Sequence, residues 1–244
     1  MDGLAEQLAL VAAELVKRHG NRFQLGPLSL RLGTGVTCLV GANGAGKSTF
    51  FRLAAGIDRP TSGHVALQSN GRVGSMGYLP QELELPRTAS CEQFLHYVAW
   101  LYRVPKPERE QAVARALERT ALSDRAGSKI RELSGGMRRR LGVAHALVHD
   151  PAVVLLDEPS AGLDPRQRAL LRETITANAE GRVVLVATHL VEDILGMADR
   201  VVVIRGGELV FDGDLLELER HDDTVVPGRS PAERAVVSLI GVSE

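Results

Sequence analysis

The sequence predicts an α/β fold, and three observations carry this prediction. Residues 36–40 form a short apolar run that is followed directly by a glycine-rich turn and a helical segment. A continuous apolar run at 153–156 and the segment RVVLVA at 182–187 have the length and composition of strands buried on both faces of a parallel sheet. A segment of helical pattern at 92–120 separates the first run from the other two. The chain therefore alternates buried strands with helices.

Composition narrows the possible classes of protein. The chain has 244 residues, 44% of them hydrophobic, which suffices for one large domain or a domain with a sizeable insertion. Its formal net charge of -1 provides no basic field, so we expect no nucleic-acid partner. Cys38 and Cys91 make no disulfide framework and lack the spacing of a metal site, which favours a reducing cytosol. No apolar run is long enough to cross a membrane, so any membrane role should require a partner protein.

The first functional motif is the glycine-rich turn after the first apolar run. Its spacing, G-x-x-x-x-G-K-S, is that of a phosphate-binding loop, in which backbone N–H groups surround phosphate oxygens at a helix N-terminus. We expect Lys47 to reach the β- and γ-phosphates of a nucleotide and the Ser48 hydroxyl to bind Mg²⁺. The strand before the turn and the helix after it disfavour a chance match. The predicted phosphate-binding residues are Gly41, Ala42, Asn43, Gly44, Ala45, Gly46, Lys47, Ser48 and Thr49.

Two acidic residues end the second apolar run, in the sequence VVLLDE. A buried parallel strand presents the residues at its carboxyl end to the ligand-binding edge of the sheet. Asp157 is therefore a candidate to hold Mg²⁺ through water. Glu158 should point the other way because side chains alternate along a strand, and there it could polarise the water that attacks the γ-phosphate. A solvated pair of acids is the less favoured alternative beside a phosphate-binding loop.

Two further polar residues follow apolar segments. His189 comes after the run at 182–187, at the same kind of strand end as Asp157, which favours a γ-phosphate contact over a purely structural histidine. Gln81, in GYLPQE, follows another short apolar segment and could reach the metal or its water. The predicted catalytic residues are Glu158, His189, Gln81 and Lys47, and the predicted metal ligands are Ser48, Gln81 and Asp157.

Together these segments resemble the nucleotide-binding subunit of ATP-binding cassette (ABC) transporters. The most specific likeness is LSGGM at 133–137, which resembles the family's signature motif. The other motifs follow the family's order: Walker A at 41–49, the Q-loop at Gln81, Walker B at 153–158, the D-loop at 160–164 and the H-loop at His189.

The resemblance implies a particular version of the α/β fold. This is the P-loop NTPase fold of ABC ATPases, with a mixed β core, an antiparallel β part and an inserted α-helical subdomain. The implied ABC ATPase domain covers 8–219, with the helical subdomain at about 82–150 inserted in a RecA-like core, and a short C-terminal tail covers 220–244.

The serine and glycines of the signature precede a helical segment, where backbone N–H groups and a hydroxyl could bind a second anion. The resemblance implies that Ser134, Gly135 and Gly136, with Asp164 of the D-loop, contact ATP held at the P-loop of another subunit. The chain has one P-loop, one signature and no internal repeat, so the partner would be a second copy or a homologous subunit. ATP and Mg²⁺ are the implied cofactors, and hydrolysis would release the dimer.

Three positions depart from the family's commonest pattern. Ala42 stands where the loop often has proline, and Met137 stands where the signature usually has glutamine; neither change should alter the phosphate contacts much. His19 stands where the family usually has an aromatic residue that stacks on adenine. Histidine has a smaller ring face, so base recognition could be looser, and a surface turn histidine is the alternative.

The resemblance also implies a partner in the membrane. Helical segments at 92–103 and 107–120 resemble the family's helical subdomain, which together with the Q-loop receives the coupling helix of an integral-membrane permease. This region and the MRRR after the signature glycines resemble the bacterial exporter branch of the family. The resemblance implies that the chain acts at the cytoplasmic face of the cell membrane, where its permease holds it. A soluble ABC ATPase acting in protein assembly or on ribosomes is the alternative. A small-molecule kinase would have no use for LSGGM.

The residues after the H-loop are less informative. The segment 200–210 should form a hairpin that turns at Gly206 and Gly207. The amphipathic segment 232–240 is equally consistent with a dimer or regulatory contact and with a loosely ordered end.

Overall fold

The fold is taken from a computed structural model, which describes residues 8–20, 23–69, 75–221 and 230–240. Its strands are β1 (Ala9–His19), β2 (Phe23–Leu32), β3 (Gly35–Val40), β4 (Ser62–Gln68), β5 (Met76–Leu79), β6 (Val153–Asp157), β7 (Val183–Thr188), β8 (Arg200–Arg205) and β9 (Glu208–Gly213). Its α-helices are α1 (Lys47–Ala54), α2 (Cys91–Leu101), α3 (Arg109–Arg119), α4 (Gly135–Leu147), α5 (Pro165–Ala177), α6 (Val191–Met197), α7 (Leu215–Glu219) and α8 (Pro231–Ile240). Short 3-10 turns are η1 (Lys106–Glu108), η2 (Ser123–Arg125) and η3 (Ile130–Glu132).

A six-stranded mixed sheet organises the described chain, in the order β5-β6-β7-β3-β8-β9. The pairs from β5 to β8 are parallel, and only the β8–β9 pair is antiparallel, as the predicted hairpin requires. Every residue of β6 and β7 is buried, because helices and a second sheet cover the two faces. This confirms the α/β fold and the apolar runs interpreted as parallel strands.

The two faces of this sheet pack against different layers. Alternate residues of β6, such as Val153 and Leu155, join the core formed with α1, β1 and β2. The intervening residues, Val154 and Leu156, join a second core formed with α4, α5, α6 and α8. Side-chain alternation along each strand therefore serves two cores at once, which explains why the strands are apolar throughout.

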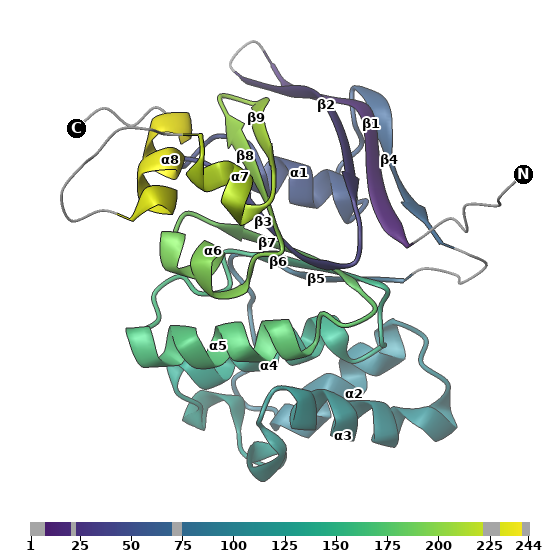
Figure 1. The fold of residues 1–244 in the computed structure, drawn as a ribbon. Coiled ribbons are helices and arrows are strands. Elements are labelled where there is room, and N and C mark those ends of the chain that lie inside the picture. Colours follow the sequence, from purple (N-terminus) through teal and green to yellow (C-terminus); the bar gives the residue numbers. More distant parts are fainter. Residues whose placement is uncertain (1–7, 21–22, 70–74, 222–229, 241–244) are drawn as a thin grey trace, which may run out of the picture.

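The smaller sheet is antiparallel, in the order β2-β1-β4. It covers the α1 side of the large sheet, in the upper part of Figure 1. The backbone N–H of Gly26 in β2 donates to the carbonyl of Gly207 at 2.7 Å, which ties this sheet to the β8–β9 hairpin. The smaller sheet thereby brings β1 and β2 to the glycine-rich loop at 41–46.

A helical layer of α2, α3 and α4 forms a third core away from the sheets, in the lower part of Figure 1. Ser90 starts α2 with a capping box, in which its hydroxyl accepts from the backbone N–H of Gln93. The predicted helix at 107–120 begins instead as the turn η1, with Pro107 inside it, and continues as α3. Among the described residues, no helix is both long enough and apolar enough to cross a membrane.

The closing amphipathic segment is the helix α8. Its residues Ala235 and Val236 are buried in the same core as α5 and α6, so the helix packs on the large sheet although it lies beyond residue 219. The rest of the tail, at 222–229 and 241–244, lies outside the described residues.

Candidate functional site

The glycine-rich loop at 41–46 connects β3 to α1, and its last residues, Ala45 and Gly46, are buried. Gly46 has φ 110°, in the left-handed region, and a Cβ there would lie 2.7 Å from Leu25 and 3.0 Å from Phe23. Only glycine meets both conditions. The carbonyl of Ala45 accepts from the backbone N–H of Gly207 at 3.1 Å, so the hairpin supports the loop from behind. The predicted strand, loop and helix are all present.

Lys47 is the first residue of α1, and only 5% of it is exposed. Its ammonium donates to the backbone carbonyls of Gly41 at 2.7 Å and Ala42 at 3.3 Å. It also pairs with Oε1 of Glu158, at 3.5 Å. These acceptors fix a positive charge at the mouth of the loop, where the N-terminus of α1 adds a partial positive charge.

Glu158 lies between the lysine and the predicted histidine. The same oxygen, Oε1, is 3.4 Å from Nδ1 of His189, whose side chain is about half exposed. Two strand ends, those of β6 and β7, therefore deliver an acid and an imidazole to one point beside Lys47. Such a cluster can orient a water and accept its proton next to a phosphate held by the loop.

The position of Glu158 has a different origin from the strand alternation that the sequence suggested. Strand β6 ends at Asp157, and Glu158 has φ 48°, a left-handed backbone that is costly for a residue with a Cβ. Its N–H donates to the carbonyl of Ala187 at 3.1 Å, and its carbonyl accepts from Ala161 at 3.2 Å. One local hydrogen bond and one to the neighbouring strand β7 therefore hold the turn that directs the carboxylate toward Lys47.

Asp157 fits a cation site. Oδ1 of Asp157 is buried and has no hydrogen-bond partner among the residues that the structure describes. Burial raises the pKa of this carboxyl and the charge of Glu158 adds to the effect, whereas the Ser48 hydroxyl and Lys47 oppose it. A buried carboxylate oxygen without a donor is costly unless a cation faces it, so these residues fit Mg²⁺. Mg²⁺ commonly uses one or two carboxylates together with substrate phosphates and waters, which suits a site with a single aspartate.

Lys47, Glu158 and His189 line a pocket of about 660 Å³, whose lining does not include Asp157. Its lining residues are His19, Phe23, Asn43, Gly44, Gly46, Lys47, Ser48, Thr49, Gln81, Glu158 and His189. The structure thus brings together most of the predicted nucleotide-side residues. The signature residues and Asp164 are absent from this lining.

Sequence reasoning missed one member of the lining, Phe23. Its ring centroid lies 6.2 Å from that of His19, with an interplanar angle of 32°, and both rings line the same pocket. An aromatic residue four positions after His19 was the available signal. The two rings together offer a larger surface to a nucleobase than histidine alone.

The signature motif begins α4 and points to a different place. The Ser134 hydroxyl accepts from the backbone N–H of Met137 at 3.2 Å, so it caps the helix that it was predicted to open. A Cβ at Gly135 would meet nothing, whereas one at Gly136 would overlap the Gln167 amide of α5. Gly135 therefore faces open space, and Gly136 lets α4 and α5 approach closely.

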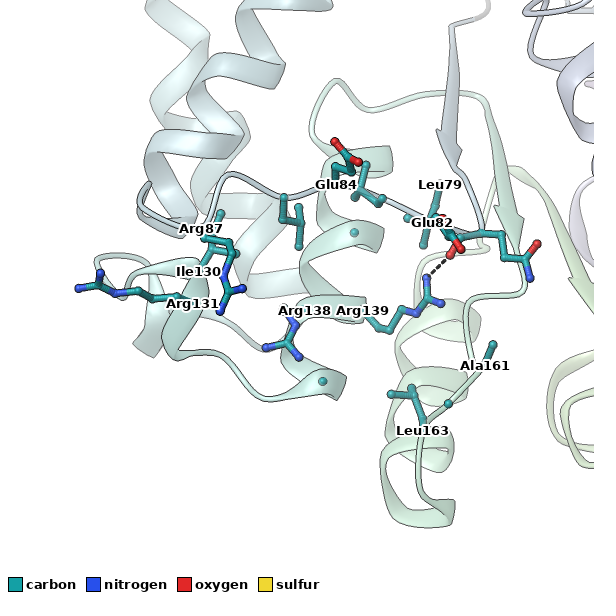
Figure 2. A pocket seen from close by; sticks show the side chains of 16 residues that line it. Leu79, Glu82, Glu84, Arg87, Ile130, Arg131, Arg138, Arg139, Ala161 and Leu163 are labelled. Carbon is teal, nitrogen blue, oxygen red and sulfur yellow. Dashed lines mark hydrogen bonds between the residues drawn. The ribbon is translucent and has the colours of Figure 1, made fainter.

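A second pocket, of about 580 Å³, lies beside this helix start (Figure 2). It is lined by the segment after Gln81, by η3 and α4, and by Ala161 to Leu163 of the loop before α5. The Arg139 guanidinium donates to the backbone carbonyl of Gln81 at 2.9 Å, the dashed line in Figure 2. Gln81 lines both pockets, so it connects the P-loop site with the signature helix.

Asp164 has a structural contact of its own. Its carboxylate caps α5 by accepting from the backbone N–H of Gln167 at 2.9 Å, and Pro165 follows in the first turn. The structure thus places this carboxylate at the N-terminus of α5.

The fold and the site define a P-loop nucleotide-binding protein, with a glycine-rich loop between strand and helix, a buried aspartate at the end of β6 and a second glycine-rich helix start. Comparison with known proteins places it more closely. A family model described as ABC transporter matches residues 25–161, more than half of the chain. The chain therefore belongs to the ABC transporter family, which confirms the resemblance drawn from its motifs.

Individual relatives agree. The "Uncharacterized ABC transporter ATP-binding protein sll0415" of Synechocystis is 34% identical over 82% of this chain and 59% of the relative. The "Nod factor export ATP-binding protein I" of Rhizobium meliloti is 32% identical over 86% of this chain and 66% of the relative. The chain thus spans about three fifths to two thirds of these relatives' length. The solved structure of cbiO1 from Clostridium perfringens, "Part of the ABC transporter complex cbiONQ", has a TM-score of 0.75 and 28% identity, covering 88% of this chain and 94% of that one.

Proposed function

We propose that the chain is the ATP-binding and ATP-hydrolysing subunit of a membrane ABC transporter, a bacterial exporter whose permease is a separate protein. The observation that carries this proposal is the meeting of Lys47, Glu158 and His189 at the mouth of the P-loop. These three groups come from three elements, α1 and the ends of β6 and β7, and share one carboxylate oxygen. A purely structural ion pair would not require the strained backbone at Glu158.

Each residue of the pocket has a role in this proposal. The P-loop amides and Lys47 bind the β- and γ-phosphates, and His189 contacts the γ-phosphate. Glu158 orients the attacking water and accepts its proton, a role that its place between two cationic or hydrogen-bonding groups supports. Ser48, Asp157 and Gln81 would hold Mg²⁺, which when bound neutralises charge on the phosphates.

The nucleobase would lie at the open end of the pocket. His19 and Phe23 supply two ring faces there, on β1 and β2. Stacking on these rings would orient adenine without hydrogen bonds to its edge.

The separation of the two helix starts supports a dimer. The glycines of the signature are absent from the lining of the P-loop pocket, and Gly135 faces open space. A second copy of the chain, or a homologous subunit, would bring its signature to the γ-phosphate and Asp164 to the same interface. ATP would then join the two subunits, and hydrolysis would separate them.

A permease would couple to the second pocket. It includes the segment after Gln81 and lies on the helical segment of about 82–150, the part proposed as a subdomain inserted in the core of residues 8–219. The likeness to a Nod factor export protein supports the exporter branch, and the likeness to cbiO1, which is part of a transporter complex, supports assembly with other transporter subunits. The chain would then act at the cytoplasmic face of the membrane, held there by its permease.

The variant Glu158→Gln tests the hydrolytic part of this proposal. It keeps the size of the side chain but removes the proton acceptor, so ATP turnover should fall by at least about 1,000-fold while ATP still binds. Glu192→Gln, on the exposed side of α6, is the matched control and should leave turnover unchanged. Full turnover in Glu158→Gln would contradict the role of this carboxylate.

A further inference from the structure

Asp193, on α6, is a fully buried carboxylate that none of the motifs explains. Its side chain is 0% exposed. Oδ2 accepts from the Ser160 hydroxyl at 2.5 Å and from the Thr188 hydroxyl at 2.9 Å. Oδ1 pairs with Nη1 of Arg172 on α5, at 3.3 Å. A buried charge is retained only when such partners satisfy it, and here both oxygens are satisfied.

The two hydroxyls belong to the two loops that complete the candidate site. Ser160 lies two residues after Glu158, in the loop that ends at Asp164. Thr188 lies directly before His189, and its Oγ1 also accepts from the backbone N–H of Leu190 at 3.0 Å. One carboxylate oxygen therefore connects the loop after β6 with the turn after β7.

The third partner of Asp193, Arg172, packs against α6 at Gly196. A Cβ at Gly196 would lie 2.8 Å from Nε of Arg172, so this glycine leaves room for the arginine against α6. The guanidinium of Arg172 balances the charge of Asp193. Arg172 belongs to α5, which begins at Pro165, directly after Asp164. The connection thus reaches both ends of the 159–164 loop.

We propose that Asp193 is a positioning residue that holds the 159–164 loop and the Thr188–Leu190 turn as one rigid unit. His189 and Asp164, on the two loops, then keep a fixed separation. If His189 contacts a γ-phosphate in its own subunit and Asp164 faces the partner subunit, as the proposed function has it, the state of one nucleotide is transmitted across the interface by this unit. The inference rests on the proposed function only in this last step.

The chain supplies a matched control one residue away. Glu192 on α6 pairs with Arg168 on α5 at 3.2 Å, but its side chain is 66% exposed. This pair joins the same two helices without touching either hydroxyl. An exposed pair of this kind contributes little to stability.

The first test uses hydrogen exchange on the chain without nucleotide, so that it does not depend on activity. In Asp193→Ala, amide exchange should rise at least about tenfold in 159–164 and in 188–190 together, because both lose their shared acceptor. Glu192→Gln should leave both segments unchanged. Faster exchange in only one segment, or in neither, would overturn the proposal.

The second test separates a positioning role from a general loss of fold stability. It also avoids the cavity that Asp193→Ala would leave in the buried site. Ser160→Ala and Thr188→Val each remove one donor and leave the Asp193–Arg172 pair in place. Each should lower kcat for ATP about threefold to tenfold with KM within about twofold, and their combined effect should be clearly smaller than the product, because both act through one oxygen. Thr188→Ser, which keeps the hydroxyl, should restore kcat.

Strictly multiplicative effects of the two substitutions, or no rescue by Thr188→Ser, would contradict a joint role for Asp193. If the unmodified chain and Glu192→Gln hydrolyse ATP but these variants do too at full rate, the inference fails and the proposed function stands. If the unmodified chain hydrolyses no ATP, the proposed function fails while the exchange result still decides whether the two loops are connected.

Discussion

Two helices of this chain, α1 and α4, each start at a glycine-containing turn, and the two starts differ in how far they are enclosed. At α1 the end of the loop is buried: Lys47 and Ala45 are each 5% exposed, and two backbone carbonyls hold the lysine. At α4 the helix is capped by its own serine, and Ser134 and Gly135 are exposed. The first turn holds a buried lysine within the chain, whereas the second leaves Ser134 and Gly135 at the surface.

One sequence feature, glycine before a helix, therefore serves two purposes. Inside the chain, the glycine at 46 allows a backbone conformation and a close approach that other residues cannot reach. On the surface, Gly135 satisfies no such local need, because a Cβ there would meet nothing. An unforced glycine at an exposed helix start is explained if another molecule approaches it closely.

The largest effect should come from the enclosed turn. Lys47→Ala removes the buried ammonium and leaves Glu158 without its cationic partner, so ATP affinity of the isolated chain should fall at least about 100-fold. Titration with a fluorescent ATP analogue measures this. Lys106→Ala, at the exposed start of η1, is the control that should bind normally. Near-normal ATP affinity in Lys47→Ala would contradict the view that the turn at α1, unlike the turn at α4, binds the nucleotide within one chain.

The open turn should affect turnover instead of binding. Gly135→Asp adds a negative charge where the γ-phosphate of a partner's ATP would lie, so turnover should fall at least about 100-fold. ATP affinity of the single chain should stay within about twofold. Gly127→Asp puts the same charge at another open glycine of the helical segment and should leave turnover unchanged. Lost affinity in Gly135→Asp alone would show that the signature serves its own chain's nucleotide.

Acid should weaken the helical layer that carries the open turn. Burial lowers the pKa of His145, near the end of α4, and of His149 to about 4. Both are neutral in the folded chain near pH 6, where the unfolded chain starts to bind protons at its ordinary pKa of 6.5. The free energy of unfolding should therefore drop by a few kcal/mol as pH falls from 6.5 to 4.

Urea unfolding followed across this pH range checks that expectation. His149→Phe keeps the ring that stacks on Tyr102, with centroids 3.7 Å apart, but removes the titration. In this variant the free energy of unfolding should fall about half as much between pH 6.5 and 4, since His145 still titrates. An unchanged slope would mean that other groups cause the acid sensitivity.

The smallest effect concerns the nucleobase. Phe23→Ala should weaken ATP binding by about tenfold and His19→Ala by about threefold, because stacking contributes roughly 1 kcal/mol per ring. Calorimetric titration with ATP and GTP measures both affinity and base preference. If each variant weakened the binding of inorganic triphosphate as much as the binding of ATP, the rings would not contact the base.

The sequence was most informative where function depends on neighbouring residues. The P-loop, the strands before Asp157 and His189, and the hairpin at Gly206 follow from contiguous patterns, and the structure has them all. The meeting of Glu158 and His189 was also within reach, since parallel strands present their carboxyl ends at one edge.

Features that depend on distant contacts were not predictable. The left-handed backbone at Glu158 requires a hydrogen bond to Ala187, about thirty positions along the chain, and no local pattern signals it. The packing of α8 into the core depends on its contacts with α6, α7 and β8, which precede it in the chain. The role of Asp193 has no local signal, because its partners Ser160 and Arg172 are far away in sequence.

A mixture of two inactive variants tests whether two chains share each ATP. Lys47→Ala lacks a working P-loop and Gly135→Asp lacks a working signature, so neither should hydrolyse ATP alone. In a mixed dimer, the P-loop of the Gly135→Asp chain meets the signature of the Lys47→Ala chain, and one complete site forms. We therefore expect mixing to restore ATP hydrolysis. A mixture as inactive as its components, alongside an active unmodified chain, would contradict a shared site.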